Sequence, residues 1–312
     1  MKRTTLSAAL ATVMLLAACG DATTAGSTSP ATAAAPAAAT ATVAPVAPTT
    51  STVPAASRII SLSPTATEML FAIGAGGQVL AIDDQSNYPP EALQKPHDLS
   101  GYQPNVEAIA ALKPDEVVIG DDSSGLSKQL GALGLKTWVG TAATSFDGVY
   151  EQIEQLGAMT GHVAEAAALV LKMQTEIATT VKDTPRPAKP LTYYHELDNT
   201  YYSITENTFI GQVYGLFGMQ SIADTQEVSS DYPQLSAEAI ISANPDFIFL
   251  GDGGFGESPA SVAVRPGWGS LKAVTNGNVI VVDADISSRW GPRIVDYVRA
   301  IAAAITKAVG TG

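Results

Sequence analysis

The sequence predicts an α/β protein with two similar lobes, each built on a central parallel sheet flanked by helices, joined by one long helix. Residues 106–120 (VEAIAALKPDEVVIG) recur as residues 237–251 (AEAIISANPDFIFLG). Apolar strand-like segments alternate with helix-like segments in both halves, as in parallel sheets with helical crossovers. Between the halves, residues 162–182 form an Ala-rich run without Gly or Pro, which is typical of a long helix.

Both copies of the repeat predict the same local structure. A good N-cap residue, Asn105 or Ser236, precedes a short apolar-periodic helix. A Pro-Asp break then leads into an apolar run, EVVIG or FIFLG, that suits a buried parallel strand. Because the copies lie far apart in the chain, they indicate two similar lobes and not a tandem solenoid.

The first half is expected to begin as strand, helix and strand, with Pro64 in the first turn of the helix. Residues 87–90 (NYPP) predict a turn, because X-Pro steps disfavour helix. Apart from the repeat, the expected strands are 58–63, 78–83 and 136–139, and the expected helices are 64–74, 126–135 and 145–160.

The second half follows a Pro-rich break at residues 183–190. Its alternation of apolar and polar segments resembles that of the first half, and it ends in an apolar-periodic helix. Apart from the repeat, the expected strands are 191–196, 201–204 and 278–283, and the expected helices are 208–219 and 291–309.

The N-terminus predicts a lipoprotein signal peptide over residues 1–18. A basic start precedes an apolar stretch that is too short to span a bilayer. Residues 16–19 (LAAC) resemble a bacterial lipobox, in which the Cys becomes the lipidated first residue; the alternative is an incidental small residue. Cys19 is the only cysteine, so no internal disulfide can form. We therefore expect an extracytoplasmic protein anchored to the cell membrane by an N-terminal lipid.

The domain organisation follows from composition. Residues 19–57 consist almost entirely of Ala, Thr, Pro and Ser and predict a disordered linker that tethers the folded part. The remaining chain suits two lobes of ordinary domain size. The expected divisions are an N-terminal lobe at 58–160, a connecting helix at 161–185 and a C-terminal lobe at 190–312.

Charge and motif content exclude several classes of function. The net charge is −13, and removal of residues 1–18, which hold two basic residues and no acidic ones, makes it more negative. This balance argues against nucleic acid as a partner and against a polybasic membrane contact. We find no nucleophile, phosphate-binding, dinucleotide or zinc motif, and His97, His162 and His195 lack metal-ligand spacing. We therefore expect no catalytic residue, no metal site and no cofactor, and we interpret His195 as a structural, hydrogen-bonded histidine.

Aromatic and charged residues collect in loops after the predicted strands, where open parallel sheets present their binding crevice. Tyrosine rings offer flat area together with a polar tip, which suits a large, partly polar ligand. The alternative for each tyrosine is packing at a lobe edge. The candidate ligand-binding residues from this pattern are Tyr88, Tyr102, Tyr202, Tyr232, Asp285, Arg289 and Trp290, to which Asp121 is added below.

Glu107 and Glu238 form a second candidate site. Both lie two residues after an N-cap, where a carboxylate favourably meets the positive end of the helix dipole, and this effect alone can explain either residue. Their equivalence in the repeat places one exposed carboxylate on each lobe. Such a pair could make a two-point contact with a partner that carries basic residues.

Several segments together resemble the ABC-transporter substrate-binding proteins of the cobalamin and ferric-siderophore group. The resemblance covers residues 58–308. It is carried by the two repeat copies and by residues 58–74 (RIISLSPTATEMLFAIG), 87–89 (NYP), 265–268 (RPGW) and 288–293 (SRWGPR).

The resemblance implies a ligand held between the lobes, small closure movements, and docking of Glu107 and Glu238 on arginines of a permease dimer. In the vitamin B12-binding branch, cleft aromatics correspond to Tyr88, Tyr102, Tyr202 and Tyr232, and an acid–base pair near the ligand corresponds to Asp285 and Arg289. That branch has Trp where this chain has Tyr102, Tyr232 and Asp121. The phenol and carboxylate oxygens at these three positions could bind ferric iron, so a ferric siderophore or haem stays an alternative ligand.

The sequence thus predicts a monomeric, lipid-anchored solute receptor that captures a large metal chelate, with cobalamin or another corrinoid as first choice, and delivers it to an ABC permease. The alternative ligand is a ferric siderophore or haem. The alternatives from other classes are an exported enzyme and an adhesion lipoprotein. For these we find neither a nucleophile–base or metal constellation nor β-sandwich repeats.

Overall fold

The computed structural model describes residues 55–225 and 230–310. The predicted signal peptide, Cys19 and residues 19–54 of the predicted linker lie outside the described residues. In the part that is described, none of the helices combines the length and apolar character needed to cross a membrane. Residues 53–312 form one compact unit.

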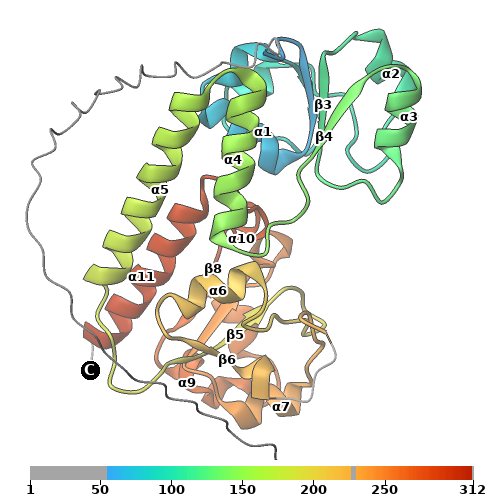
Figure 1. The fold of residues 1–312 in the computed structure, drawn as a ribbon. Helices are drawn as coiled ribbons and strands as arrows, with labels where there is room; N and C mark the ends of the chain where they lie inside the picture. The colour runs from blue at the N-terminus through green and yellow to red at the C-terminus, as the bar shows by residue number, and fades with distance from the viewer. Residues whose placement is uncertain (1–54, 226–229, 311–312) are drawn as a thin grey trace, which may run out of the picture. The chain divides into compact units, whose positions relative to one another are not determined.

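Two four-stranded parallel sheets organise this unit and share the same strand order (Figure 1). The first sheet runs β2-β1-β3-β4 and the second runs β6-β5-β7-β8. The strands are β1 (Ile59–Leu62), β2 (Val79–Ile82), β3 (Glu116–Ile119), β4 (Lys136–Val139), β5 (Thr192–Glu196), β6 (Gln220–Ser221), β7 (Phe247–Leu250) and β8 (Val279–Val281). The predicted fold class of two parallel sheets flanked by helices is confirmed.

Helices follow the strands in both halves, as parallel connections require. The first half contains α1 (Pro64–Ala72), α2 (Val106–Ala111), α3 (Leu126–Ala132) and α4 (Phe146–Thr160), and α5 (Val163–Asp183) leads to the second sheet. The second half contains α6 (Phe209–Gly215), α7 (Ala237–Ala243), α8 (Pro259–Ala263), α9 (Lys272–Thr275), α10 (Ala284–Ser288) and α11 (Ile294–Gly310).

The helix of each repeat copy has the N-cap that its sequence predicts. The Asn105 side chain accepts a hydrogen bond from the Ala108 N–H at 3.0 Å, at the start of α2. The Ser236 side chain accepts one from the Ala239 N–H at 3.1 Å, at the start of α7. Both caps satisfy a backbone donor that the helix itself cannot pair.

The aspartate of each Pro-Asp break binds the start of a neighbouring strand, β1 in the first sheet and β5 in the second. Asp115 Oδ2 accepts from the Ser57 N–H at 3.1 Å and from the Ser57 hydroxyl at 3.0 Å. Asp246 Oδ2 accepts from the Thr192 N–H and the Thr192 hydroxyl, each at 3.0 Å. The repeated aspartate therefore performs the same structural role in both halves.

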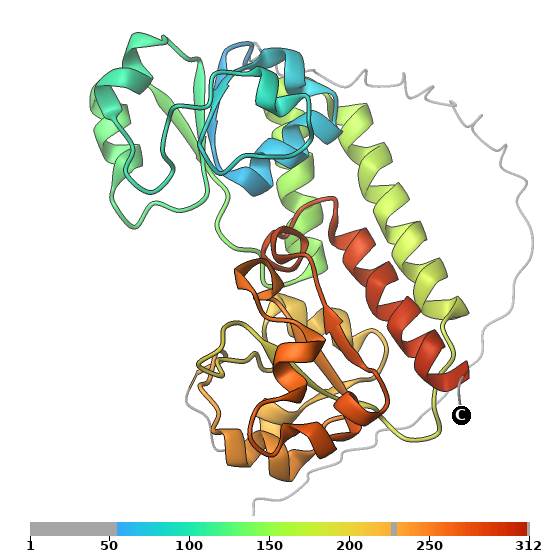
Figure 2. The same cartoon turned by 180° about the vertical axis from the view of Figure 1, so that it is seen from behind.

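The inner faces of both sheets contribute to one continuous apolar cluster. Along β7, Phe247 and Phe249 belong to this cluster, whereas Ile248 and Leu250 point to the outer face and pack in a separate one. The shared cluster also contains buried residues of α1, α4, α5, α6 and α11. Figure 2 shows α5 and α11 side by side, and both contribute buried residues to this cluster. The two sheets are therefore held by a common core.

Some elements differ from the sequence-based expectation. Residues 201–204 form no strand and make a single antiparallel bridge, Tyr202 to Gln234. Helix α6 ends at Gly215, earlier than predicted, and α11 begins only after Pro292. The short helices α8 and α10 were not predicted, since five residues are too few to show a helical period.

The strand-start aspartates allow a matched test of the repeat. Replacing Asp246 by Ala removes two hydrogen bonds from Thr192 and an ion pair with Lys272 at 3.5 Å, so we expect the free energy of unfolding to fall by about 1–3 kcal/mol. Asp115→Ala should also destabilise, but by less, because its carboxylate is exposed to water. Urea denaturation followed by circular dichroism measures both. Equal stability of D246A and the wild type would contradict the structural role of the repeat.

Candidate functional site

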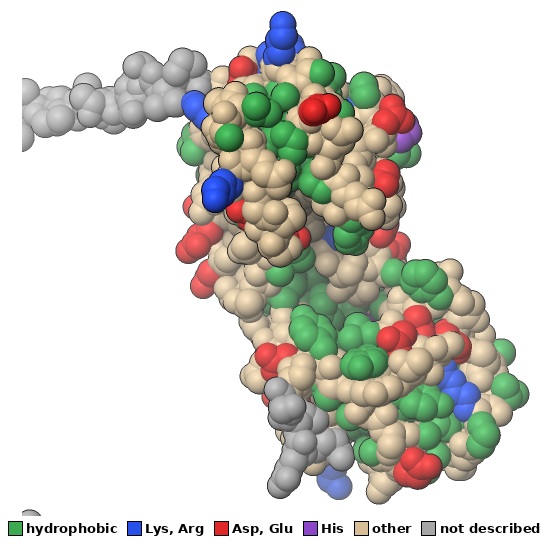
Figure 3. Space-filling model, turned by 90° about the vertical axis from the view of Figure 1, so that its right-hand side faces the viewer, with side chains coloured by type: hydrophobic (Ala, Val, Ile, Leu, Met, Phe, Trp, Pro, Cys, Tyr) green, Lys and Arg blue, Asp and Glu red, His purple; other side chains and the backbone are tan. Residues whose placement is uncertain are grey.

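The loops after the strands place aromatic and charged side chains at the carboxyl ends of both sheets. In open parallel sheets this edge is where ligands bind, because the connections diverge there. Figure 3 views the molecule from the right-hand side of Figure 1 and shows hydrophobic side chains on both sides of a hollow between the halves that carry the two sheets. The segments that follow β2, β3, β5, β6 and β8 hold the predicted ligand-binding residues.

Backbone pairing brings together the loops that carry Tyr202 and Tyr232. The Ser203 N–H donates to the Pro233 carbonyl at 2.9 Å, next to the bridge between Tyr202 and Gln234. The two tyrosine side chains remain exposed, at 40% and 56%. The second half therefore presents two phenol rings from adjacent loops.

The first half presents Tyr102 and Tyr88 from separate loops. The loop that carries Tyr102 is held against the end of β2 by a bridge between Asp83 and Leu99. A side chain at Gly101 would collide with Asp83 Oδ2 and the Leu62 carbonyl, each 2.9 Å from the ideal Cβ, so this close approach requires glycine. Tyr102 is 86% exposed, and Tyr88 is 41% exposed.

Asp121 is engaged by a neighbour in its own loop. Its Oδ1 accepts from the N–H of Ser123 at 2.9 Å and from the hydroxyl of Ser123 at 2.6 Å. These hydrogen bonds from Ser123 hold the pKa of the Asp121 carboxyl below its usual range, so it is a carboxylate at neutral pH. The side chain is exposed at the end of β3.

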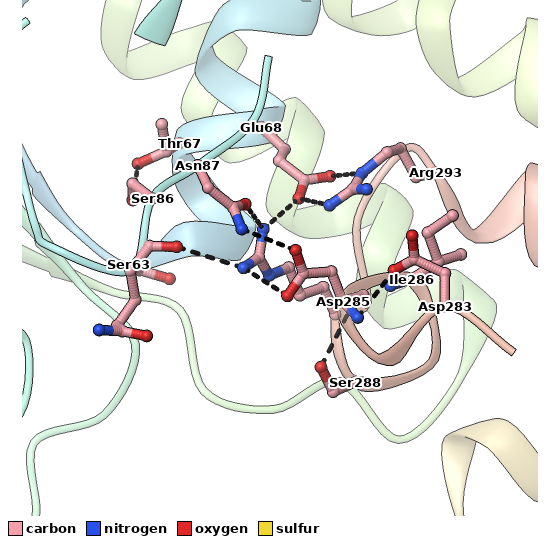
Figure 4. Close-up of polar contacts among 12 residues, drawn as sticks. Ser63, Thr67, Glu68, Ser86, Asn87, Asp283, Asp285, Ile286, Ser288 and Arg293 are labelled. Carbon is pink, nitrogen blue, oxygen red and sulfur yellow. Dashed lines mark hydrogen bonds and ion pairs between the residues drawn. The ribbon is translucent and has the colours of Figure 1, made fainter. Parts of the chain in front are cut away.

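Asp285 and Arg289 pair with each other, as their spacing suggests, but Arg289 makes further contacts across the molecule. Arg289 Nη2 lies 2.9 Å from Asp285 Oδ1, and Nη1 lies 2.9 Å from Glu68 Oε1 on α1 (Figure 4). Nη1 also donates to Asn87 Oδ1 at 2.7 Å, and Nη2 donates to the Gln85 carbonyl at 3.2 Å. Both terminal nitrogens of Arg289 are therefore engaged by protein groups.

Glu68 is the centre of this network and was not predicted from the sequence. It is 3% exposed and also accepts two hydrogen bonds from Arg293, one of them from Nε at 2.8 Å. The hydrogen bonds to Glu68 raise the pKa of Arg293. The guanidinium of Arg293 lies over the ring of Tyr88, 4.2 Å from its centroid. A charged residue inside the apolar pattern of residues 64–74 was the only signal in the sequence.

Neighbouring residues fix the same segment. Trp290 Nε1 donates to Gln152 Oε1 on α4 at 3.0 Å, and its ring packs against the shared core. An added Cβ at Gly291 would lie 3.6 Å from Glu68 Oε2 and 3.8 Å from Thr65 of α1. The segment from Asp285 to Arg293 therefore rests directly on the first half of the molecule.

A second buried ion network lies at the end of β5. Arg265 makes a bidentate pair with Glu196, with both N–O distances 2.6 Å, and contacts Glu257 at 2.7 Å. Asp252, beside this network, is 3% exposed, and neither of its carboxylate oxygens has a hydrogen-bond partner. Burial, together with the charge of Glu196, raises the Asp252 pKa to about 6. Apart from the RPGW segment, no pattern in the sequence indicated this cluster.

His195 is a buried structural residue, as predicted. It is 2% exposed, and its Nδ1 lies 2.8 Å from the Tyr214 hydroxyl, which in turn lies 2.6 Å from the Tyr297 hydroxyl. Burial lowers the pKa of His195 to about 4, so the ring is neutral at physiological pH.

Glu107 and Glu238 are exposed in the first turns of α2 and α7. Both therefore meet the positive end of a helix dipole, as expected. Within residues 55–225 and 230–310, no group of three or more His, Cys, Asp or Glu side chains is placed to hold a metal ion.

A groove of about 390 Å³ lies along α1, α5 and α11. Of the predicted ligand-binding residues it contains Tyr88 alone, and its charged walls are Glu68, Lys172, Glu176, Arg293, Asp296 and Arg299. Because most of these charges come from α1, α5 and α11, and not from the loops at the carboxyl ends of strands, we do not assign the ligand to this groove.

Comparison with known proteins identifies a family. Residues 59–286 match the family model described as periplasmic binding protein. A cobalamin-binding protein of Halobacterium salinarum is 33% identical over 77% of this chain and 66% of its own length. The chain thus spans just under two thirds of that relative. An uncharacterised ABC transporter substrate-binding lipoprotein of Bacillus subtilis is 30% identical over 80% of this chain and 79% of its own.

Solved structures show the same fold. The periplasmic vitamin B12 binding protein of Vibrio cholerae has a TM-score of 0.67 and 26% identity, over 81% of this chain and 98% of that one. A periplasmic haem-binding protein from Roseiflexus has a TM-score of 0.70 and 23% identity, over 80% of this chain and 98% of that one.

The pKa of His195 predicts how stability depends on pH. In the unfolded chain a histidine binds a proton below about pH 6.5, whereas in the fold His195 binds one only below about pH 4. The unfolded state therefore binds more protons between these values, and acidification across this window should cost about 3 kcal/mol of folding free energy.

His195→Gln removes this proton site. Because Asp252 titrates in the same region with the opposite sign, the useful quantity is the difference in unfolding free energy between the wild type and H195Q, measured by urea denaturation from pH 7 to pH 4. We expect the wild type to lose stability relative to H195Q as the pH falls. Parallel pH profiles would show that His195 is not buried in its neutral form.

Proposed function

The chain belongs to the periplasmic binding protein family, and we propose that it is a lipid-anchored receptor that captures a corrinoid such as cobalamin for an ABC importer. The observation that carries this proposal is the set of exposed tyrosines at the carboxyl ends of both sheets: Tyr88, Tyr102, Tyr202 and Tyr232. The names of the Halobacterium salinarum relative and of the Vibrio cholerae structure support the same ligand.

The chemistry of a corrinoid suits this set of side chains. A corrin ring is broad and flat, and its edge carries amide groups. Phenol rings can pack on the flat face and hydrogen-bond to the amides. Asp285, whose side chain is 37% exposed, can accept hydrogen bonds from amide N–H groups. Asp121 offers a further exposed carboxylate at the end of β3.

The proposed mechanism is equilibrium binding without chemistry on the ligand. The shared apolar core limits movement between the halves, since separating them would expose buried side chains of both sheets. We therefore propose a site that closes only slightly around its ligand. A preformed site of this kind loses little free energy to ordering when the ligand binds.

Delivery to the importer is proposed to use Glu107 and Glu238. The two exposed carboxylates come from equivalent positions of the repeat and can meet basic residues on the two subunits of a permease dimer. An N-terminal lipid on Cys19 is proposed to keep the receptor at the membrane, in line with the lipoprotein relative of Bacillus subtilis.

Haem or a ferric siderophore is the second candidate ligand. Tyr102 and Tyr232 are exposed phenols, and phenolate oxygen binds ferric iron well. The fold likeness to the haem-binding protein from Roseiflexus is compatible with this alternative.

Calorimetric titration of the full chain tests the ligand. We expect cyanocobalamin to bind with a Kd of about 1 μM or tighter, and more tightly than haemin or a ferric hydroxamate siderophore. Tyr202→Ala should weaken cobalamin binding about tenfold, which corresponds to about 1.4 kcal/mol for a central aromatic contact. Tight binding of haemin without cobalamin binding would establish the second candidate instead.

The docking role has a separate test in cells that depend on the importer. The double variant Glu107→Ala/Glu238→Ala should reduce cobalamin uptake at least tenfold and leave the titrated affinity unchanged. Glu151→Ala/Glu154→Ala removes the same charge from exposed positions of α4 and serves as the matched control. Loss of ligand affinity in the Glu107/Glu238 variant, or equal uptake in both double variants, would refute the docking role.

A further inference from the structure

Glu68 connects the first half of the molecule to the segment from Asp285 to Arg293. Glu68 lies on α1, and its Oε1 is 2.9 Å from Arg289 Nη1. The same carboxylate accepts two hydrogen bonds from Arg293. Figure 4 shows the carboxylate of Glu68 facing the guanidinium of Arg293, and Arg289 pairs with both Glu68 and Asp285, each at 2.9 Å. Asn87 completes the contact by donating to Asp285 Oδ2 at 2.8 Å.

Burial differs sharply among the four charged groups. The side chain of Glu68 is 2% exposed, those of Arg289 and Arg293 are 10% and 13% exposed, and that of Asp285 is 37% exposed. The two negative and two positive charges cancel. Glu68 and Arg293 line the groove along α1, α5 and α11 to which we do not assign the ligand. On the side of the carboxyl ends, a ligand meets this network mainly through the exposed residues Asp285 and Asn87.

This distribution of charge determines which ligand can bind against the surface formed by Asp285 and Asn87, called the wall below. A free arginine would bind a ligand carboxylate through paired hydrogen bonds. Here the guanidinium groups are already occupied by Glu68 and Asp285, and the exposed group is itself an anion. An amide edge, as in a corrinoid, can donate to that anion, whereas the propionates of haem would meet like charge.

We propose that Glu68 is a positioning residue that sets ligand specificity by holding Arg289 and Arg293 away from the ligand. The wall then favours an amide-bearing chelate and disfavours one with carboxylates. The inference rests on the proposed function, because it concerns the same site, and it assigns the selectivity to a residue that does not contact the ligand.

The test compares the affinities of the full chain for two probes, cyanocobalamin and haemin, by titration. In Glu68→Gln the side chain keeps its shape but loses its charge, so Arg289 and Arg293 are left with one anion between them. We expect the ratio of haemin affinity to cobalamin affinity to rise at least tenfold. Glu68→Gln/Arg293→Gln restores charge balance, and its ratio should return towards that of the wild type.

Two further variants keep the test decisive. Glu176→Gln makes the same change in another ion pair, 3.0 Å from Arg299 on α11, and should leave the ratio unchanged. Asp285→Asn keeps the contacts of Glu68 and removes the exposed anion, so it should shift the ratio in the direction of E68Q even if E68Q fails to fold. Circular dichroism establishes which variants are folded at the titration temperature.

The outcomes separate this inference from the proposed function. A parallel loss of both affinities in E68Q, a ratio that the double variant does not restore, or an unchanged ratio in D285N would refute the positioning role. A wild-type chain that binds neither probe would refute the proposed function and this inference with it. Cobalamin binding by the wild type with an unchanged ratio in folded E68Q would refute the inference alone.

Discussion

The apolar cluster shared by the two sheets constrains everything else in this structure. Each sheet has only four short strands, and the inner faces of both are buried together with α5 and α11. Moving the halves apart would expose that apolar surface to water, at a free-energy cost of about 25 cal/mol for each Å² exposed. The core therefore favours one separation of the two sheets, and a ligand site between their carboxyl ends must be largely preformed. Specificity must then come from the fixed placement of charges and rings.

Buried ion networks supply that fixed placement at the ends of both sheets. Glu68 orders two arginines near the first sheet, and Glu196 holds Arg265 near the second. Burying such pairs adds little net stability, because desolvation offsets much of the attraction, but removing one partner leaves a costly unpaired charge. Both networks are therefore better suited to fixing a single arrangement than to strengthening the fold. At Arg289 this fixed arrangement is the basis of the proposed ligand selectivity.

The sequence allowed the architecture to be predicted well and the site only in part. Period and capping signals are local, so the repeat, its N-caps and the long helix could be read directly, as Asn105 and Ser236 show. The contact of Glu68 with Arg293 joins positions 225 residues apart, and no local pattern encodes such a pair. A glutamate in a helix is usually exposed, so its burial could not be inferred. For the same reason Arg289 was predicted near the ligand and beside Asp285, but without its contacts to Glu68 and Asn87.

The repeat also shows where the two halves have diverged. Asp121 and Asp252 occupy equivalent positions, directly after Gly120 and Gly251. Asp121 is exposed and bound by Ser123, whereas Asp252 is buried without a partner beside Glu196. The paired aspartates at the strand starts and the paired glutamates Glu107 and Glu238 are thus alike in both halves. The aspartates at the carboxyl ends of the strands, Asp121 and Asp252, have different surroundings. A ligand held between these ends would meet unlike chemistry on its two sides, as expected for a chelate whose two faces are not equivalent.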